Sequence, residues 1–233
     1  MKLEQFFNEC ILTSTVDKSD EWLIKRKSGI GGSEAATILG KNEYQTLYDL
    51  YLDKVSDVAG ERITNEAIEK GNRLEQPLID VFFALHPDYI SINTKDISLK
   101  SKKYSFMNAN LDGAFIDQGN NKCILEIKTT TIKRKSMVDE WPHWDLEKNE
   151  FVECVPNRYF CQVLHYLAVT GFDKAIIFAL LDYDYSQKRE LHEVVINKED
   201  FADDIKFLIE EEKKFWERIV NRNPPNFMEN ITR

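Results

Sequence analysis

The sequence is poor in the residues that build disulfide or zinc scaffolds. Its 233 residues include four cysteines, which are Cys10, Cys123, Cys154 and Cys161. No two of them form a CxxC pair, which argues against zinc-ribbon and iron–sulfur sites. The four histidines show no HxH or HxxxH spacing, which argues against a histidine-rich zinc site. We therefore expect reduced thiols that mainly pack in the interior of a cytoplasmic protein.

The chain also lacks linkers and long hydrophobic runs. Six prolines and nine glycines, without a low-complexity tract, give no sign of a flexible linker, so we expect one domain over residues 1–233. No run of about 18 apolar residues is present, which excludes a transmembrane helix. Residues 1–10 carry two glutamates and have no apolar core, unlike a signal peptide. We expect no membrane partner.

The net charge is −9, from 31 Lys and Arg against 40 Asp and Glu. An acidic chain is repelled on average by nucleic acid, which argues against a protein that simply coats DNA. The charge is compatible with an enzyme that collects carboxylates around metal ions and keeps its basic residues in one groove. Apolar residues make up 42% and charged residues 30%, as in ordinary globular proteins.

Hydrophobic periodicity predicts a mixture of helices and strands. Helical spacing covers residues 20–27, 34–39, 46–55, 64–85, 158–169 and 198–221. Ser33 is a suitable N-cap for the second of these helices. Short alternating segments predict strands over residues 89–92, 97–99, 104–109, 110–117, 122–129, 174–181 and 190–195. Helices that flank a central mixed sheet, built mostly of hairpins, place the chain in the α/β (α+β) class.

The strongest chemical signal is Asp112 followed by Glu126 and Lys128. Side chains alternate along a strand, so Glu126 and Lys128 point to one face while Ile127 points to the opposite, apolar face. A hairpin centred near Gly119 places Asp112 opposite Glu126, at roughly 5 Å. Two carboxylates at that distance suit Mg²⁺ or Mn²⁺, which can activate a water molecule for attack on a phosphodiester. The alternative is a surface hairpin with a cross-strand salt bridge.

Two helices offer further polar groups for the same site. Glu75 lies beside the apolar stripe of the helix over residues 64–85, so it is a candidate third carboxylate or a solvated glutamate. Tyr159, Gln162 and Tyr166 share one face of the helix over residues 158–169. The amide of Gln162 could orient water or phosphate without adding charge, or simply be satisfied in the core. For His165 we favour a satisfied core residue.

Basic and hydroxyl residues suggest contacts with phosphate. Arg26 and Ser33 flank a glycine-rich turn, where a guanidinium and a hydroxyl could bind a phosphate group or the turn could be an ordinary capped one. Lys133 and Arg134 directly follow the strand of Glu126 and fit contacts with a nucleic-acid backbone or a solvated face. Trp141 and Trp144 could stack on bases, although packing onto the body is the interpretation that we favour.

Five sequence blocks in order resemble one family. They are GIGGSEAA at residues 29–36, GNRLE at 71–75, NLDG at 110–113, LEIKT at 125–129 and QVLHYLAVTG at 162–171. Together they resemble the YqaJ-type viral recombinases, relatives of phage lambda exonuclease in the PD-(D/E)XK nuclease superfamily. The resemblance spans roughly residues 22–182 and implies a restriction-endonuclease-like core.

The resemblance implies a Mg²⁺-dependent exonuclease that degrades one strand of duplex DNA from a 5′ end and leaves 3′ overhangs for recombination by strand annealing. It assigns metal binding to Asp112, Glu126 and the Ile127 carbonyl, and catalysis to Lys128. Glu75 and Gln162 complete the implied active site, and Arg26 and Ser33 match the positions that hold the terminal 5′-phosphate. It further implies a homotrimer, a single-strand annealing partner, and a phage or prophage protein in a bacterial host cell.

Two other functions remain open from the sequence. One is a PD-(D/E)XK DNA endonuclease, which would also cut a covalently closed circle. The other is a non-catalytic DNA- or protein-binding module on the same fold, which the net charge mildly favours. The complete set of Asp112, Glu126 and Lys128 argues against the second.

Overall fold

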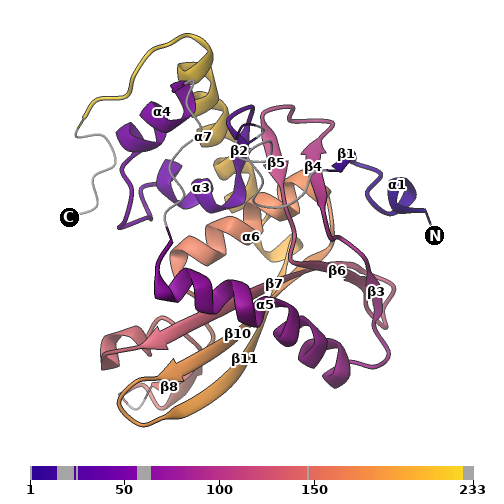
Figure 1. Cartoon of the computed structure of the whole chain (residues 1–233), viewed down its shortest axis with the longest axis vertical. Helices are drawn as coiled ribbons and strands as arrows, with labels where there is room; N and C mark the ends of the chain where they lie inside the picture. Colours follow the sequence, from indigo (N-terminus) through magenta and orange to yellow (C-terminus); the bar gives the residue numbers. More distant parts are fainter. Residues whose placement is uncertain (1, 15–23, 25, 57–63, 146, 228–233) are drawn as a thin grey trace.

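The larger of the sheets forms the centre of the molecule. The computed structural model describes residues 2–14, 24, 26–56, 64–145 and 147–227. Five strands are arranged in the order β11-β10-β7-β6-β3, and they span Lys188–Asn197, Lys174–Tyr183, Lys122–Ile132, Gly113–Ile116 and Ile90–Ile92. β7 pairs parallel with β10, and the other pairs are antiparallel. The sheet is therefore mixed, and β7 is its central strand (Figure 1).

Four other strands form a second sheet, whereas the sequence predicts a single central sheet. Its order is β1-β4-β5-β2, with bounds Cys10–Ser14, Ile97–Ser101, Met107–Ala109 and Ile30–Gly31. β8 (His143–Asp145) and β9 (Glu150–Val152) make a separate hairpin. β1 and β4 pair across more than 80 residues of chain, a contact that local patterns do not reveal. The mixed α/β class is nevertheless confirmed.

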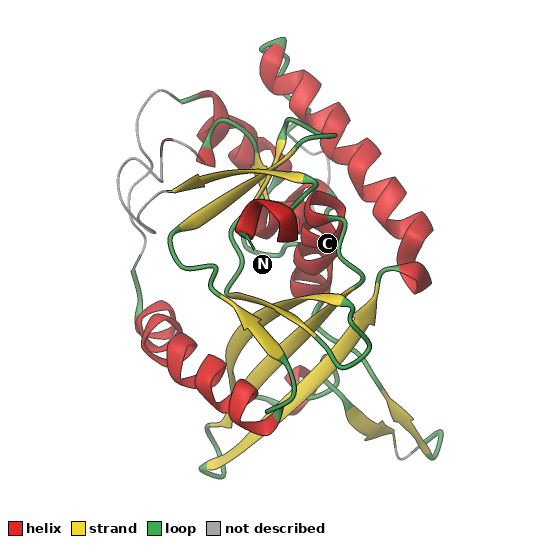
Figure 2. Ribbon diagram, turned by 90° about the vertical axis from the view of Figure 1, so that its right-hand side faces the viewer, coloured by secondary structure: helices red, strands yellow, loops and turns green. Residues whose placement is uncertain are grey.

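The helices surround these sheets (Figure 2). They are α1 (Leu3–Phe6), α3 (Gly32–Ile38), α4 (Leu47–Val55), α5 (Glu66–Leu85), α6 (Asn157–Thr170) and α7 (Ala202–Val220). Short 3₁₀ turns span Lys135–Met137 and Glu199–Phe201. The predicted helix over residues 20–27 lies mostly outside the described residues, and the other predicted helices are confirmed within a few residues. None of the described helices is long and apolar enough to cross a membrane.

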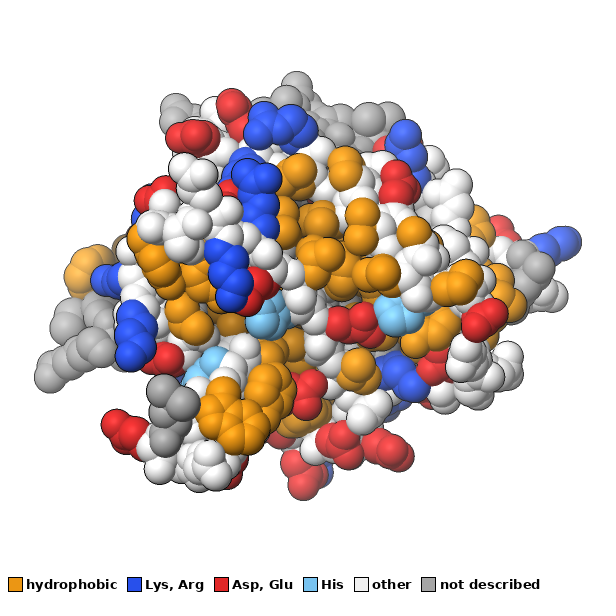
Figure 3. All heavy atoms as spheres, turned by 90° about the horizontal axis from the view of Figure 1, so that it is seen from below, with side chains coloured by type: hydrophobic (Ala, Val, Ile, Leu, Met, Phe, Trp, Pro, Cys, Tyr) orange, Lys and Arg blue, Asp and Glu red, His pale blue; other side chains and the backbone are white. Residues whose placement is uncertain are grey.

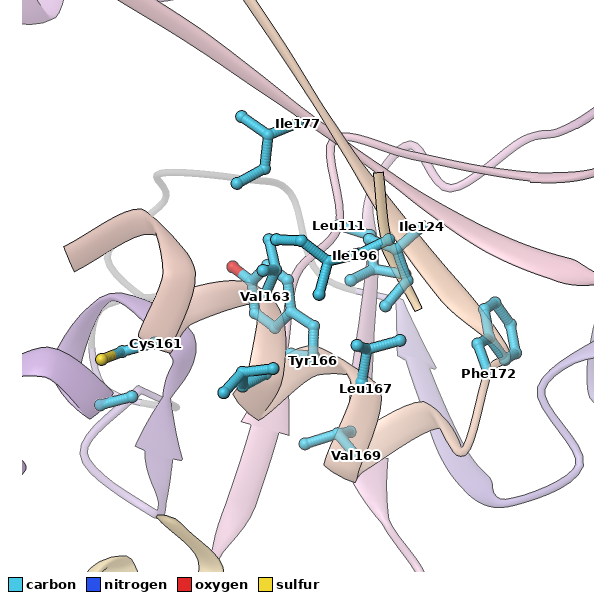
Figure 4. Close-up of a cluster of buried hydrophobic side chains, with 14 of the residues drawn as sticks. Leu111, Ile124, Cys161, Val163, Tyr166, Leu167, Val169, Phe172, Ile177 and Ile196 are labelled. Atoms are coloured by element: carbon cyan, nitrogen blue, oxygen red, sulfur yellow. The ribbon is translucent and has the colours of Figure 1, made fainter. Parts of the chain in front are cut away.

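Two of the helices cover opposite faces of the central sheet. Side chains of β7 alternate between them, so that Leu125 and Ile127 pack in the cluster under α5 with Phe82. Ile124 instead packs toward α6, beside Leu167 and other buried residues (Figure 4). Burying each such side chain stabilises the fold by roughly 1.5–3 kcal/mol. This alternation leaves Glu126 on the α6 side, inside the molecule.

Caps at the helix ends agree with the sequence in most places. Thr46 accepts a hydrogen bond from the amide of Asp49 at the start of α4, and Asn65 caps α5 through Ile68. Gly171 ends α6 in a left-handed conformation with φ 71°. Ser33 is not the N-cap of α3, as the sequence suggested. The helix begins one residue before it, because the Glu34 carboxylate accepts the amide of Gly31 at 2.9 Å.

The face of the molecule seen from below is partly apolar (Figure 3). α5 leaves part of the outer strand of the sheet uncovered, so Leu191 and Val195 of β11 remain exposed. All four cysteines are free, and Cys10, Cys123 and Cys161 are buried. Burial raises the pKa of the Cys10 and Cys123 thiols to about 12, so these two thiols stay protonated, as packing residues do.

Candidate active site

The hairpin of β6 and β7 brings the two predicted carboxylates together. Its register pairs Gly113 with Leu125, and one further step places Asp112 opposite Glu126, as the sequence predicts. Asp112 lies just before β6, and its Oδ2 accepts a hydrogen bond from the backbone amide of Ile127 at 2.8 Å. This bond fixes the Asp112 side chain against the strand that carries Glu126 and Lys128.

Glu126 is a buried carboxylate with only one of its oxygens satisfied. Its side chain is 2% exposed, and Oε1 accepts hydrogen bonds from Lys128 Nζ at 2.5 Å and Gln162 Nε2 at 2.6 Å. Oε2 is buried and has no hydrogen-bond partner among the described residues. Burial, and then the nearby charge of Asp112, raise the pKa of Glu126 to about 8. The side chain thus carries an acceptor that positive charge would stabilise.

Lys128 supplies part of that positive charge. Burial alone would lower the pKa of its ammonium, but the carboxylates of Glu126 and Asp112 outweigh burial and raise the pKa. The ammonium is therefore protonated at neutral pH. It also lies 4.9 Å from the ring centroid of Tyr159, which is half-buried on α6. Lys128 is thus held between a carboxylate and an aromatic ring.

Gln162 joins this centre to Tyr166, which was not among the site residues predicted from the sequence. Besides its bond to Glu126, Gln162 Nε2 donates to the Tyr166 hydroxyl at 3.0 Å, one turn along α6. A Cβ at Gly32 would lie 2.4 Å from the Tyr166 ring, so a glycine is needed where the two segments approach. The signal was present in the shared helix face, but the contact with Gly32 requires the tertiary fold.

A cavity of about 660 Å³ opens beside these groups. Its wall includes Arg26, Ser33, Glu75, Asp112, Gln162 and Tyr166. Five of these six residues were predicted from the sequence as site residues. Glu126 lies behind the wall and is connected to it through Gln162. The cavity is therefore lined by an arginine and a hydroxyl as well as by carboxylates.

The side of the cavity that carries Arg26 is held by a buried lysine. Arg26 Nη2 lies 3.2 Å from Ser33 Oγ and 3.6 Å from the Glu34 carboxylate. Lys54 Nζ donates to the carbonyls of Arg26 and Gly29 at 2.7 and 2.6 Å and pairs with Glu34 at 2.7 Å. From the sequence, Lys54 was only one position on an amphipathic helix. The sequence does not reveal its role, because its partners lie 20 or more residues away along the chain.

The remaining predicted residues lie farther from the cavity. Lys133 and Arg134 are exposed just after the end of β7 and are not part of the cavity wall. Trp141 is 1% exposed and packs on Tyr159, as the packing interpretation predicts. For Trp144 the packing interpretation is wrong, because this side chain lies on the separate β8–β9 hairpin and is 54% exposed. His165 is fully buried with both ring nitrogens in hydrogen bonds, which confirms a satisfied core residue.

The carboxylates are compatible with a divalent cation. Within the described parts of the chain, no group of three or more His, Cys, Asp or Glu side chains is arranged to hold a metal ion. Two carboxylates and a backbone carbonyl would still provide oxygen ligands, and Mg²⁺ commonly keeps several waters. The buried Glu126 Oε2 has no hydrogen-bond donor within the described structure, and a cation would compensate its charge. Asp112 and Glu126 are therefore suited to hold a divalent cation.

Known proteins are similar to this chain in sequence and in fold. The chain is 36% identical over 152 residues to the uncharacterized protein YqaJ of Bacillus subtilis strain 168, covering 65% of this chain and 42% of that relative. An alkaline exonuclease from Laribacter hongkongensis superposes with a TM-score of 0.60 at 13% identity, over 88% of this chain and 94% of the other.

A phage-related exonuclease from Haemophilus somnus 129PT superposes with a TM-score of 0.53 at 15% identity, over 83% of this chain and 96% of the other. These structural matches establish the fold. The sequence match is more specific, because residues 21–173 match the YqaJ-like viral recombinase domain and contain all five of the blocks noted above. The chain belongs to the YqaJ-like viral recombinase domain family.

Proposed function

We propose that the protein is a Mg²⁺-dependent exonuclease that degrades one strand of duplex DNA in the 5′-to-3′ direction. The observation that carries this proposal is the convergence of Asp112, Glu126 and Lys128 beside a polar cavity, with one buried Glu126 oxygen lacking a hydrogen bond. Buried charges without compensation are costly and are retained mainly where chemistry uses them. Membership of a viral recombinase family supports a DNA substrate.

Each residue at the centre has a separate role in this proposal. Asp112, Glu126 and the Ile127 carbonyl hold Mg²⁺, or Mn²⁺ in its place, which supplies charge neutralisation and lowers the pKa of water. Lys128 stabilises negative charge on the phosphate, because its raised pKa favours the ammonium over a free base. Gln162 orients the Glu126 carboxylate. Glu75, on the cavity wall, accepts a hydrogen bond from the attacking water.

The part of the cavity wall that carries Arg26 is suited to the end of the DNA strand. We infer that Arg26 and Ser33 bind the terminal 5′-phosphate, since a guanidinium and a hydroxyl lie 3.2 Å apart on the wall. Lys133 and Arg134 contact the DNA farther from the cleaved bond, whereas Tyr159 contacts it beside Lys128. The exonuclease of Laribacter hongkongensis has been crystallised with dAMP, which supports a nucleotide ligand for this fold.

The proposal extends to the cellular role. Strand loss from 5′ ends would leave 3′ overhangs for phage-type recombination by strand annealing. A single-strand annealing protein and assembly into a homotrimer, both by analogy with the family, belong to the same proposal. The proposal also includes a single domain over residues 1–233 and a cytoplasmic location in a bacterial host.

One experiment tests the activity directly. A linear duplex carries a 5′-phosphate at one end and a 5′-hydroxyl at the other, and a covalently closed plasmid is assayed beside it. We expect Mg²⁺-dependent strand loss from the phosphorylated end, an intact circle, and no loss with Lys128→Ala. Lys214→Ala is the matched control, because Lys214 is exposed and pairs with Glu211 on α7.

Two outcomes would contradict the proposal. Cutting of the closed circle would identify an endonuclease instead. The absence of metal-dependent loss on every substrate would indicate a non-catalytic module.

A further inference from the structure

A row of alternating cations and aromatic rings leads from the catalytic centre to the surface. Lys128 Nζ lies 4.9 Å from the Tyr159 ring centroid, and the Arg158 guanidinium carbon lies 4.5 Å from the same centroid. The Arg158 guanidinium also lies 5.9 Å from the ring centroid of Tyr44. These distances are within the range of cation–π attraction. The row therefore connects the α3–α4 loop to α6 and to the strand of Glu126.

The two ends of the row differ in exposure. Tyr159 is half-buried and packs on Trp141, with ring centroids 5.9 Å apart. Tyr44 is 77% exposed. Leaving a tyrosine ring in water forgoes the free energy of burying it, and the guanidinium of Arg158 stands beside this ring. The outer end is thus an aromatic surface with a cation next to it.

The charge around Arg158 favours a neutral ligand over phosphate. Arg158 Nη1 lies 3.8 Å from the Glu140 carboxylate and 4.0 Å from that of Glu43. These two carboxylates outnumber the single guanidinium, so the local charge does not attract a phosphate group. A nucleobase is uncharged and stacks on tyrosine and on guanidinium planes. The same carboxylates also limit how far Arg158 can turn toward solvent.

We propose that Tyr44 and Arg158 form a stacking subsite for an unpaired nucleobase of single-stranded DNA. The inference rests on the proposed function, because the row ends at Lys128, where that function places the cleaved phosphate. An unpaired base of the strand that leads away from this phosphate would lie on Tyr44, with Arg158 between this ring and that of Tyr159. Stacking there would hold the strand without sequence preference, because every base has a π-face.

Binding without hydrolysis tests the subsite. The probe is a short 5′-phosphorylated single strand that contains the fluorescent base 2-aminopurine, titrated in EDTA so that no cleavage occurs. Stacking should quench the probe. We expect Tyr44→Ala to bind roughly tenfold more weakly and to lose the quench. Tyr44→Phe should retain both the affinity and the quench, because it keeps the ring. Arg158→Lys should bind the probe with an affinity between those of wild type and Tyr44→Ala.

The control and the contradicting outcomes are distinct. Tyr185→Ala removes another exposed tyrosine, on the turn between β10 and β11, and should leave binding and quench unchanged. Equal binding and quench in Tyr44→Ala and wild type would overturn the subsite. Strand loss in the duplex assay would at the same time support the proposed exonuclease activity, so the two proposals fail separately. A wild-type protein that neither binds nor quenches the probe would overturn the subsite whatever the duplex assay shows. Equal losses in Tyr185→Ala would also overturn it.

Discussion

Two groups of buried charges in this molecule differ in how completely they are satisfied. The structural cluster consists of Glu34, Lys54, His165 and Glu212. In it Lys54 pairs with Glu34 at 2.7 Å, and His165 Nδ1 lies 2.8 Å from the Glu212 carboxylate. The second ring nitrogen, His165 Nε2, donates to the backbone carbonyl of Asn108 at 2.8 Å, because a carbonyl oxygen can only accept. No buried side-chain atom of this cluster lacks a hydrogen bond.

The second group, which we call the catalytic cluster after its proposed role, consists of Asp112, Glu126 and Lys128. Here Glu126 Oε2 is buried without a partner in the described structure, and the neighbouring Asp112 raises the electrostatic cost. A fully satisfied buried network contributes to a unique packing, whereas a partly satisfied one reduces stability. The difference indicates that the structural cluster holds α3, α4, α6 and α7 together, and it is consistent with the catalytic role that we propose for the other cluster.

The largest expected effect comes from neutralising the catalytic cluster. Glu126→Gln removes a metal ligand, so we expect nuclease activity to fall by about three orders of magnitude or more. Stability should change little, because glutamine has nearly the same shape and its amide oxygen can still accept the hydrogen bond from Lys128. Strand-loss assays and thermal unfolding measured on the same preparation check both parts. A variant that retained activity, or that unfolded well below wild type, would remove the distinction between the clusters.

Breaking the structural cluster should affect folding. Glu212→Ala leaves His165 buried beside Lys54 and Glu34 without its carboxylate, and we expect a loss of about 3 kcal/mol in urea unfolding. A His165→Leu, Glu212→Leu double variant should recover part of that loss, because no buried partner is left alone. Glu211→Ala, at the adjacent half-exposed position, is the control. A small effect of Glu212→Ala would show that the cluster is not needed for stability.

The smallest expected effect is a change of stability with pH. Because the folded-state pKa of Glu126 is raised to about 8, the folded protein binds a proton that the unfolded chain releases near its ordinary pKa of 4.5. The free energy of unfolding of the metal-free protein should therefore fall as pH rises from 4.5 to about 8. The fall should be larger for wild type than for Glu126→Gln, which has no carboxyl group at this position. We expect a difference of a few degrees in melting temperature, which Mg²⁺ should offset.

The control for this experiment is Mg²⁺ added to Glu126→Gln, where little stabilisation is expected at either pH. Melting curves at pH 6 and pH 8.5 are sufficient. If wild type and Glu126→Gln changed equally with pH, the raised pKa would not belong to Glu126.

The sequence predicted the catalytic cluster better than its surroundings. Strand alternation and the hairpin register depend on local geometry, which is why Asp112, Glu126 and Lys128 were placed correctly relative to one another. The hydrogen bonds of Lys54 and the contact of Tyr44 with Arg158 join segments distant in sequence, so no local period reveals them.

The error at Ser33 has a related cause. Serine is a common N-cap, but here the Glu34 carboxylate caps the turn and also pairs with Lys54. The second sheet was missed because β1 and β2 pair with strands far along the chain. Local patterns thus defined elements and faces, whereas tertiary contacts determined which of these elements meet.

The central position of β7 has a consequence for amide exchange with solvent. β7 pairs with β6 on one side over Lys122–Leu125, and its ten paired positions with β10 on the other side include Glu126 and Lys128. A shift of one residue would turn both side chains toward α5 and replace them with Leu125 and Ile127. β10 lies between these residues and the edge strand β11, so fraying of β11 does not reach them, and their amides should exchange only when β7 separates from β10. The positions of Glu126 and Lys128 should therefore persist as long as β7 and β10 stay paired.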